Sequence, residues 1–540
     1  MKSSAIPFWR RLLAATLAVL MASSGVAQAQ VRLPALGESA SEDLTVGAER
    51  RVGDQIMAEG RRDPSYYDDP VLLEYVQSLW NPLVAAARQR GDIGAETDGA
   101  FAWEIFLMRD RSVNAFALPG GYVGVHLGLI AITTARDQLA SVLAHELSHV
   151  TQRHIARSIA PQKQASLVAL AALVLGVIAA SRANNGDMAN AAIMGGQAAA
   201  IQGQLNFSRD MEREADRIGY GVLAAAGFST AGMGAMFEKM DVATRLNDNN
   251  SYPYLRSHPL TVDRIAEARN RTLLNQSAPP APPLEHALMQ MRARVLMDDS
   301  VQGLQRLRGE TSSPELGDQL AALYGGAMAA SLLRDHARAE AQAGDALRLA
   351  AKATPREPAA ERALYLLQAQ VRLARGDAQG ALAALDALPA GSTTRAPLLL
   401  RAQAALDLHR QSGGSRTGAA AVDLRRSTEA LQTWLVDQPL DAAAWQLLAG
   451  TSEALGLKLR SMRAGAEARA VVGDLSGAID RLRAAQSVAR TPAGQDFIEA
   501  SVVDARLRQL LNQRRQMVLE ARGGRAGPPT PDAPEEPVPR

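Results

Sequence analysis

A run of prolines, Ala-Pro-Pro-Ala-Pro-Pro at 278–283, interrupts the helical patterning of the chain near its middle. Proline has no backbone N–H, and its ring clashes with the preceding turn, so a helix cannot continue through such a run. Apolar residues recur at helical spacing on both sides of it. We therefore predict a mainly α-helical chain with a first domain at 30–277, a proline-rich linker at 278–284 and a second domain at 285–521.

The first 29 residues have the parts of a secretory signal peptide. A start with three basic residues precedes an apolar stretch, and Ala27-Gln28-Ala29 fits the small-x-small cleavage pattern. The apolar stretch has about half of the roughly 20 residues needed to span a membrane, which favours cleavage over anchoring. We expect cleavage after Ala29 and a location in the periplasm. At the other end, 522–540 is rich in glycine, proline and charge and is predicted to be a disordered tail.

Composition excludes several classes of function. Lys and Arg total 58 and Asp and Glu total 56, giving a net charge of +2. The signal peptide holds three basic and no acidic residues, so the chain without it carries −1. This balance argues against a bulk polyanion binder such as a histone-like protein. Cysteine is absent, which excludes disulfides, thiol catalysis and cysteine-ligated zinc and leaves histidine and acidic residues as metal ligands.

One segment breaks the helical pattern of the first domain. Val113–Leu118 alternates like a strand, Pro-Gly-Gly follows, and Tyr122–Leu127 alternates again. This order of strand, tight turn and strand predicts a β-hairpin. The glycine spacing matches neither the Rossmann nor the P-loop pattern, so a nucleotide site is not expected there.

His145 and His149 belong to an H-E-x-x-H sequence within an apolar helical segment. Residues four apart lie on one face of a helix, so both imidazoles can reach one Zn²⁺. Glu146 lies beside them, where it can act on a zinc-bound water. A surface helix with two solvated histidines fits less well, because a polar group inside an apolar helix needs a partner.

A catalytic zinc needs a third protein ligand. The metzincin pattern fails, because Gln152 and Ile155 stand where glycine and histidine are required. A later segment offers Glu212 and Asp216 at a spacing of four, so that one could bind the metal and the other accept a hydrogen bond from a ligand histidine. Spacing alone does not separate this arrangement from a solvated acidic helix face. His154 is five residues after His149, on another helix face, and a structural role is expected for it.

Two small apolar stretches, 165–180 and 188–201, lie between these motifs and predict a helical hairpin. A buried core hairpin and a flap that gates the site or contacts lipid fit this pattern equally. In the second domain, Gly376–Ala381 recurs 97 residues later as Gly473–Ala478. Recurring small residues predict a tetratricopeptide-like α-helical solenoid, whose concave surface would hold a partner or substrate segment.

Three segments together resemble the M48 family of zinc metallopeptidases. They are Asn114-Ala115-Phe116-Ala117 with the Gly-Gly turn, HELSHVTQRH at 145–154, and SRDMEREADRIG at 208–219. A fourth segment, Ser-His-Pro-Leu at 257–260 with Arg264, resembles the closing motif of the periplasmic branch of this family. The resemblance implies a gluzincin-like α-helical zincin domain with a small β-hairpin, followed by the repeat solenoid.

The resemblance also implies the roles of individual residues. His145, His149 and Glu212 would bind one Zn²⁺ per chain, with Glu146 as the catalytic base. Asp216 would support a ligand histidine, and His258 would be a fourth ligand or stabilise the oxyanion. We further expect the strand that contains Asn114, Ala115 and Phe116 to pair with an extended substrate.

The expected function is that of an exported zinc endopeptidase acting on unfolded or misassembled proteins, in the quality control and assembly of outer-membrane β-barrel proteins. Those proteins are the expected partners, together with the outer-membrane barrel assembly machinery, reached through the repeats. Peripheral contact with the membrane is compatible with this function, and no nucleic acid is expected. The alternative is a chaperone or assembly scaffold with a latent protease site, which intact His145, Glu146, His149 and Glu212 disfavour.

Overall fold

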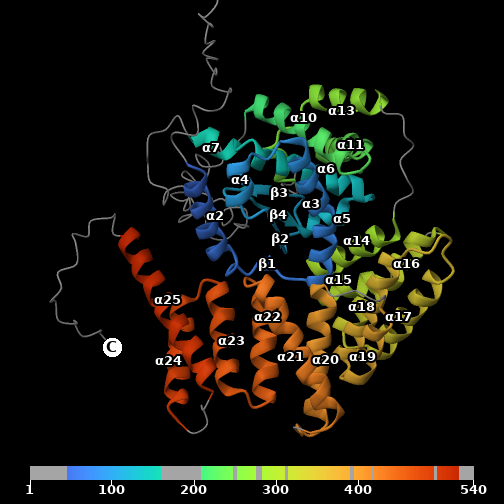
Figure 1. Ribbon diagram of the computed structural model, residues 1–540. Coiled ribbons are helices and arrows are strands. Elements are labelled where there is room, and N and C mark those ends of the chain that lie inside the picture. Colours follow the sequence, from blue (N-terminus) through green and yellow to red (C-terminus); the bar gives the residue numbers. More distant parts are fainter. Residues whose placement is uncertain are drawn as a thin grey trace, which may run out of the picture.

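The computed structural model describes residues 45–159, 208–246, 252–274, 283–309, 314–388, 394–415, 417–491 and 496–521. The signal peptide predicted at 1–29, the helical hairpin at 165–201, most of the linker at 278–284 and the tail at 522–540 lie outside these residues. The described part is mainly α-helical with one small sheet, which confirms the predicted fold class (Figure 1). It has no helix long and apolar enough to cross a membrane.

The N-terminal region contains the sheet and the helices around it. Its elements are α2 (Val46–Gly60), β1 (Tyr66–Tyr67), α3 (Pro70–Arg90), α4 (Ala95–Ala100), β2 (Glu104–Met108), β3 (Ala115–Leu118), β4 (Tyr122–His126), α5 (Leu127–Ile132), α6 (Arg136–Thr151), α7 (His154–Ile159), α10 (Arg209–Ala225), α11 (Ala231–Leu246), α12 (Tyr254–Ser257) and α13 (Val262–Leu274). Helices α3, α10 and α11 pack against α6, which β3 and β4 also contact. Helix α6 is therefore at the centre of this region.

The predicted hairpin is present as β3 and β4, which pair antiparallel with Leu118 opposite Tyr122. Its turn needs residues with positive φ, and Gly120 and Gly121 supply them at +77° and +89°. The sheet order is β1-β2-β4-β3, with β2 parallel to β4 and β1 antiparallel to β2. Strand β3 thus lies at one end of the described sheet, next to α6.

Helix α6 is buried along nearly its whole length, from Asp137 to Val150. Helix α10 comes close to it at Gly219, where an added Cβ would lie 3.1 Å from the carbonyl oxygen of Ala144. Because glycine has no side chain, the two backbones can approach there. This approach sets the first turns of α10 beside the H-E-x-x-H turn of α6.

The C-terminal region is a series of helices, and from α15 onward each packs on the next. They are α14 (Leu284–Met297), α15 (Val301–Arg308), α16 (Leu316–Leu332), α17 (His336–Ala350), α18 (Pro358–Ala374), α19 (Ala378–Asp386), α20 (Arg395–Gln411), α21 (Ala419–Asp437), α22 (Ala442–Ala454), α23 (Lys458–Val471), α24 (Leu475–Ala489) and α25 (Phe497–Ala521). The array curves beneath the N-terminal region, as a solenoid does (Figure 1).

The recurring Gly-Asp sequence marks two turns of this solenoid. Gly376 and Gly473 adopt positive φ values of +84° and +79°, two residues after the ends of α18 and α23. Asp377 then caps α19 by accepting a hydrogen bond from the N–H of Gly380, and Asp474 caps α24 in the same way. The repeat in the sequence therefore reflects a repeated helix-turn-helix connection.

The solenoid is joined to the N-terminal region at several points. Arg292 of α14 is buried and forms an ion pair with Asp69, the N-cap of α3, at 2.6 Å. Arg395 of α20 pairs with Asp68 at 2.6 Å. At the far end, an added Cβ on Gly473 would lie 2.9 Å from the carbonyl oxygen of Ala58 in α2. A cavity of about 730 Å³ lies between α3, β1, β2 and the solenoid helices, away from the H-E-x-x-H turn.

Candidate metal centre

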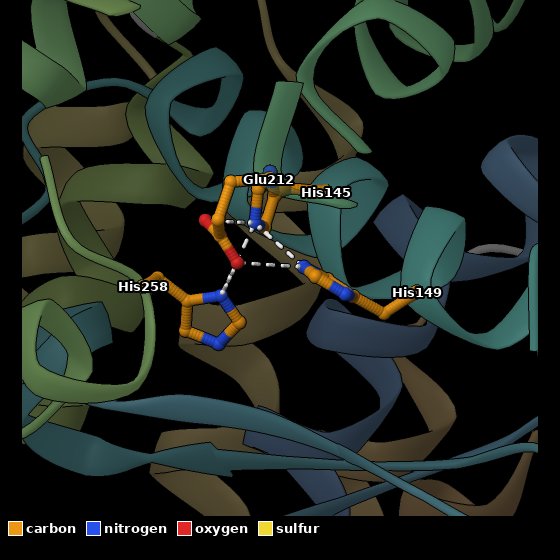
Figure 2. A group of neighbouring side chains, drawn as sticks. All are labelled: His145, His149, Glu212 and His258. Carbon is orange, nitrogen blue, oxygen red and sulfur yellow. Dashed lines mark hydrogen bonds and ion pairs between the residues drawn. The ribbon is translucent and has the colours of Figure 1, made fainter. Parts of the chain in front are cut away.

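Four buried side chains from three parts of the chain meet beside α6 (Figure 2). His145 and His149 stand one turn apart on α6, Glu212 comes from the first turn of α10, and His258 directly follows α12. Each side chain is at most 2% exposed, and one ligand atom from each lies within 4.8 Å of the others. Every residue predicted to contact the metal is therefore in this group.

The separations of the ligand atoms suit a tetrahedral metal ion. The Nε2 atoms of His145 and His149 are 3.0 Å apart, and each lies 3.5 Å from an oxygen of Glu212. Nδ1 of His258 lies 3.0 Å from Glu212 Oε1 and 3.3 Å from His145 Nε2. A tetrahedral zinc with bonds of roughly 2.0–2.1 Å holds its ligand atoms about 3.3 Å apart. Imidazole and carboxylate are also ligands that zinc prefers.

The charge balance of the group also favours a divalent cation. The carboxyl groups of Glu212 and Asp216 share one guanidinium, that of Arg264, and the carboxyl group of Glu146 is buried close to them. Burial disfavours a charged imidazole, yet the carboxylates of Asp216 and Glu212 raise the pKa of His145 to about 10. A cation at this position is therefore stabilised by its surroundings.

Asp216 and Arg264 support the group from behind. Asp216 Oδ1 lies 2.9 Å from Nδ1 of His145, the nitrogen that faces away from the other ligand atoms. The guanidinium of Arg264 donates to both oxygens of Asp216, at 2.6 and 2.8 Å, and its Nη1 lies 2.8 Å from Glu212 Oε2. The same Nη1 donates to the carbonyl of Pro259, next to His258. Such supporting contacts orient ligands and tune their affinity for metal.

Glu146 is buried beside this group with unused hydrogen-bonding capacity. It is fully buried, and neither carboxylate oxygen has a well-aligned hydrogen bond among the described residues, although the side chain of Tyr254 interacts with the carboxylate. Its Oε1 lies 3.5 Å from Nε2 of His258. Burial raises the pKa of this carboxyl group. A buried carboxylate with unused acceptor capacity can accept a hydrogen bond from a water or a substrate.

His154 lies closer to the metal group than its spacing predicts. Helix α6 ends at Thr151, and Arg153 has a positive φ of +51°, which turns the chain back. As a result, Nδ1 of His154 lies 2.9 Å from Nδ1 of His149. Burial lowers the pKa of His154 to about 4, although Glu214 opposes the change. His154 was expected on another face of the same helix, but α6 ends before it, so its direction is set by the turn at Arg153.

Tyr254 is a second neighbour that the motifs did not reveal. Its buried ring stacks on that of His258, with centroids 4.6 Å apart and planes at 25°. Its N–H donates to the carbonyl of Val113, the residue before Asn114. The segment that carries His258 is thereby connected to the start of the end strand, where Ala115 and Phe116 pair with β4.

A histidine pair on one turn of a buried helix, a glutamate between them and a second glutamate from a later helix form the arrangement of the H-E-x-x-H metallopeptidases. Residues 74–272 match the family model described as Peptidase family M48. The chain belongs to this family of metallopeptidases.

Relatives extend the match to most of the chain. The beta-barrel assembly-enhancing protease of Yersinia pestis is 30% identical over 91% of this chain and 94% of that protein. The protein of the same name from Escherichia coli K12 is 31% identical over 93% of this chain and 96% of its own length. A Vibrio cholerae relative is 39% identical, but the match spans 49% of this chain and only 52% of that protein.

Proposed function

We propose that this metallopeptidase is an exported zinc endopeptidase that cleaves unfolded or misassembled proteins. The observation that carries the proposal is Glu146, a buried carboxylate with no well-aligned hydrogen bond among the described residues, next to the convergent ligand atoms of His145, His149 and Glu212. The names of the Yersinia and Escherichia relatives support outer-membrane β-barrel proteins as the proteins whose assembly it serves.

His145, His149 and Glu212 are the proposed zinc ligands, with Asp216 holding His145 in place. Zn²⁺ bound there would supply Lewis acidity, lowering the pKa of a water and polarising a peptide carbonyl. Glu146 then takes the proton from the attacking water and delivers it to the leaving amine. Its raised pKa favours the first step, because a carboxylate with a higher pKa is a stronger base towards the attacking water.

Substrate would bind along the end strand β3. A polypeptide paired with Asn114, Ala115 and Phe116 would be held in extended form by main-chain hydrogen bonds, which read little sequence. Such binding suits unfolded chains. Once His258 has moved away from Glu212, its imidazole can donate a hydrogen bond to the developing oxyanion.

The N-terminal segment and the solenoid suggest where the protein acts and what it binds. The signal peptide at 1–29 would direct the chain to the periplasm, with the outer membrane close by. We propose that the solenoid consists of tetratricopeptide-like repeats and that it holds a substrate segment or the outer-membrane barrel assembly machinery. The cavity of about 730 Å³ beside α3 offers one site for such a segment.

Metal content and metal dependence test the proposal. The purified protein should contain about one zinc per chain and cleave a chemically unfolded outer-membrane barrel protein. Removing the metal with a chelator should abolish cleavage, and adding Zn²⁺ should restore it, since the metal would lower the pKa of the water and polarise the peptide carbonyl. Undiminished cleavage by metal-free protein would refute the proposed chemistry.

A latent protease that mainly acts as a scaffold is the second candidate, and His258 favours it. Its Nδ1 lies where a fourth ligand would be, so resting activity should be low. His258→Ala should then raise cleavage several-fold, because an open ligand position is what a catalytic zinc requires. Cleavage rates of His258→Ala and of the remote control His336→Ala would be compared. No change in His258→Ala under any condition would favour a scaffold without a working protease.

A further inference from the structure

We propose that His154 is a positioning residue that fixes the tautomer of His149 through a hydrogen-bond chain ending at Glu214. This inference rests on the proposed role of His149 as a metal ligand. His154 is completely buried. Its Nδ1 lies 2.9 Å from Nδ1 of His149, and its Nε2 lies 3.0 Å from Oε2 of Glu214.

The ring of His149 has two distinct sides. One nitrogen, Nε2, faces His145 and Glu212, and the other points away from the group (Figure 2). A ligand histidine must present a bare nitrogen to the metal, so the single hydrogen of the neutral ring has to be on Nδ1. That hydrogen points at His154.

The positions of the hydrogens along the chain follow from this requirement. Two facing nitrogens share one hydrogen, so His154 must accept at Nδ1 and carry its own hydrogen at Nε2. Nε2 then donates to Glu214, a carboxylate that only accepts. With both rings neutral, each contact has one donor and one acceptor only when His149 keeps its Nε2 bare. The chain thus selects the form of His149 that binds metal.

The backbone and a separate ion pair hold His154 in this position. Arg153 has a left-handed φ of +51°, an unfavourable conformation for a residue with a side chain. Its side chain pairs with the buried carboxylate of Glu49 at 2.9 Å, which stabilises the turn. At the other end of the chain, Arg157 donates to Glu214 at 2.8 Å. Glu214 also lies on α10, two residues after Glu212, so one helix supplies both a ligand and the last acceptor.

Metal affinity of buried variants provides the first test. Zinc dissociation constants would be measured by competition with a chromophoric chelator at one pH. His154→Leu removes the acceptor but keeps the volume, and we expect affinity to fall roughly 10–100-fold. His154→Gln can accept from His149 with its carbonyl and donate to Glu214 with its amide, so affinity should stay within about threefold of wild type.

Which of these two variants binds zinc more tightly separates a positioning role of His154 from a packing role. A purely structural role predicts the opposite order, because leucine suits a buried position better than an amide does. The inference would be overturned if the folded His154→Leu protein bound zinc as tightly as the folded His154→Gln protein.

A second pair of variants at partly exposed positions covers the case in which His154→Leu does not fold. Glu214→Met removes the last acceptor and should weaken zinc binding roughly 3–10-fold. Glu238→Met removes a surface carboxylate of α11 that pairs with Arg269, and it should change the zinc affinity by less than about twofold. Equal effects of the two would overturn the inference. If wild type itself binds no zinc, the proposed function fails; if wild type binds zinc but the variants do not differ, only the role of His154 fails.

Discussion

Replacing Glu146 with glutamine should reduce cleavage of an unfolded protein by about 10³-fold while zinc stays bound. Glutamine keeps the shape of the side chain but cannot accept the proton of the attacking water. The three proposed ligands, His145, His149 and Glu212, are unchanged in this variant. Initial rates of peptide-bond cleavage and zinc content per chain, measured on the same preparation, check both parts of the expectation.

A matched control for this variant is Glu238→Gln on α11. The carboxylate of Glu238 is about half exposed and pairs only at the surface, with Arg269. Its replacement should leave cleavage and zinc content unchanged. If Glu146→Gln kept full activity, Glu146 would not be the catalytic base, and another group would have to move the proton.

Arg264→Ala should destabilise the protein by about 3–5 kcal/mol. Arg264 is 4% exposed and compensates two buried carboxylates, those of Asp216 and Glu212. Without it both negative charges stay in a region that water does not reach, and the cost of an unpaired buried charge is large. Urea unfolding of the metal-free protein, followed by tryptophan fluorescence, would give the change.

Arg269→Ala on the same helix, α13, is the control for Arg264. Arg269 also forms a 2.6 Å ion pair, but its side chain is 60% exposed, so the loss should be below about 1 kcal/mol. Arg264→Lys should fall between the two, because lysine keeps the charge but cannot form the bidentate contact with Asp216. A loss below 1 kcal/mol for Arg264→Ala would mean that the carboxylates are protonated or compensated in another way.

The parts of the fold that could be predicted from the sequence depend on local patterns. The hairpin of β3 and β4 is predictable because two segments with strand-like alternation of side chains flank Pro-Gly-Gly. The turn between them needs glycines, since both adopt positive φ. Residues four apart lie on one face of any helix, so the pairs His145 with His149 and Glu212 with Asp216 could be placed on shared faces from the sequence. Strand β2 and its parallel pairing with β4 were not anticipated, because such a pairing joins strands that no tight turn connects.

The site was predictable only as far as helix geometry and the family resemblance reached. Spacing could not decide whether Glu212 faces the histidines, since this depends on how α10 approaches α6 at Gly219. The contact of His154 with His149 depends on the end of α6 at Thr151 and on the positive φ of Arg153. An arginine with a left-handed backbone has no sequence signature, so this contact could only come from the structure.

The multiple attachments of the solenoid have a mechanical consequence. An α-helical array that is fixed at only one end can bend. A partner that binds to it then has to fix its curvature, at a cost in conformational entropy. Here the array is held at α14 through Arg292, at α20 through Arg395 and near its end at Gly473. We therefore expect its curvature to be set before any proposed partner arrives, so that binding would cost little conformational entropy. The proposed partners would meet a stiff frame, and their affinity would depend on shape complementarity more than on adaptation of the solenoid.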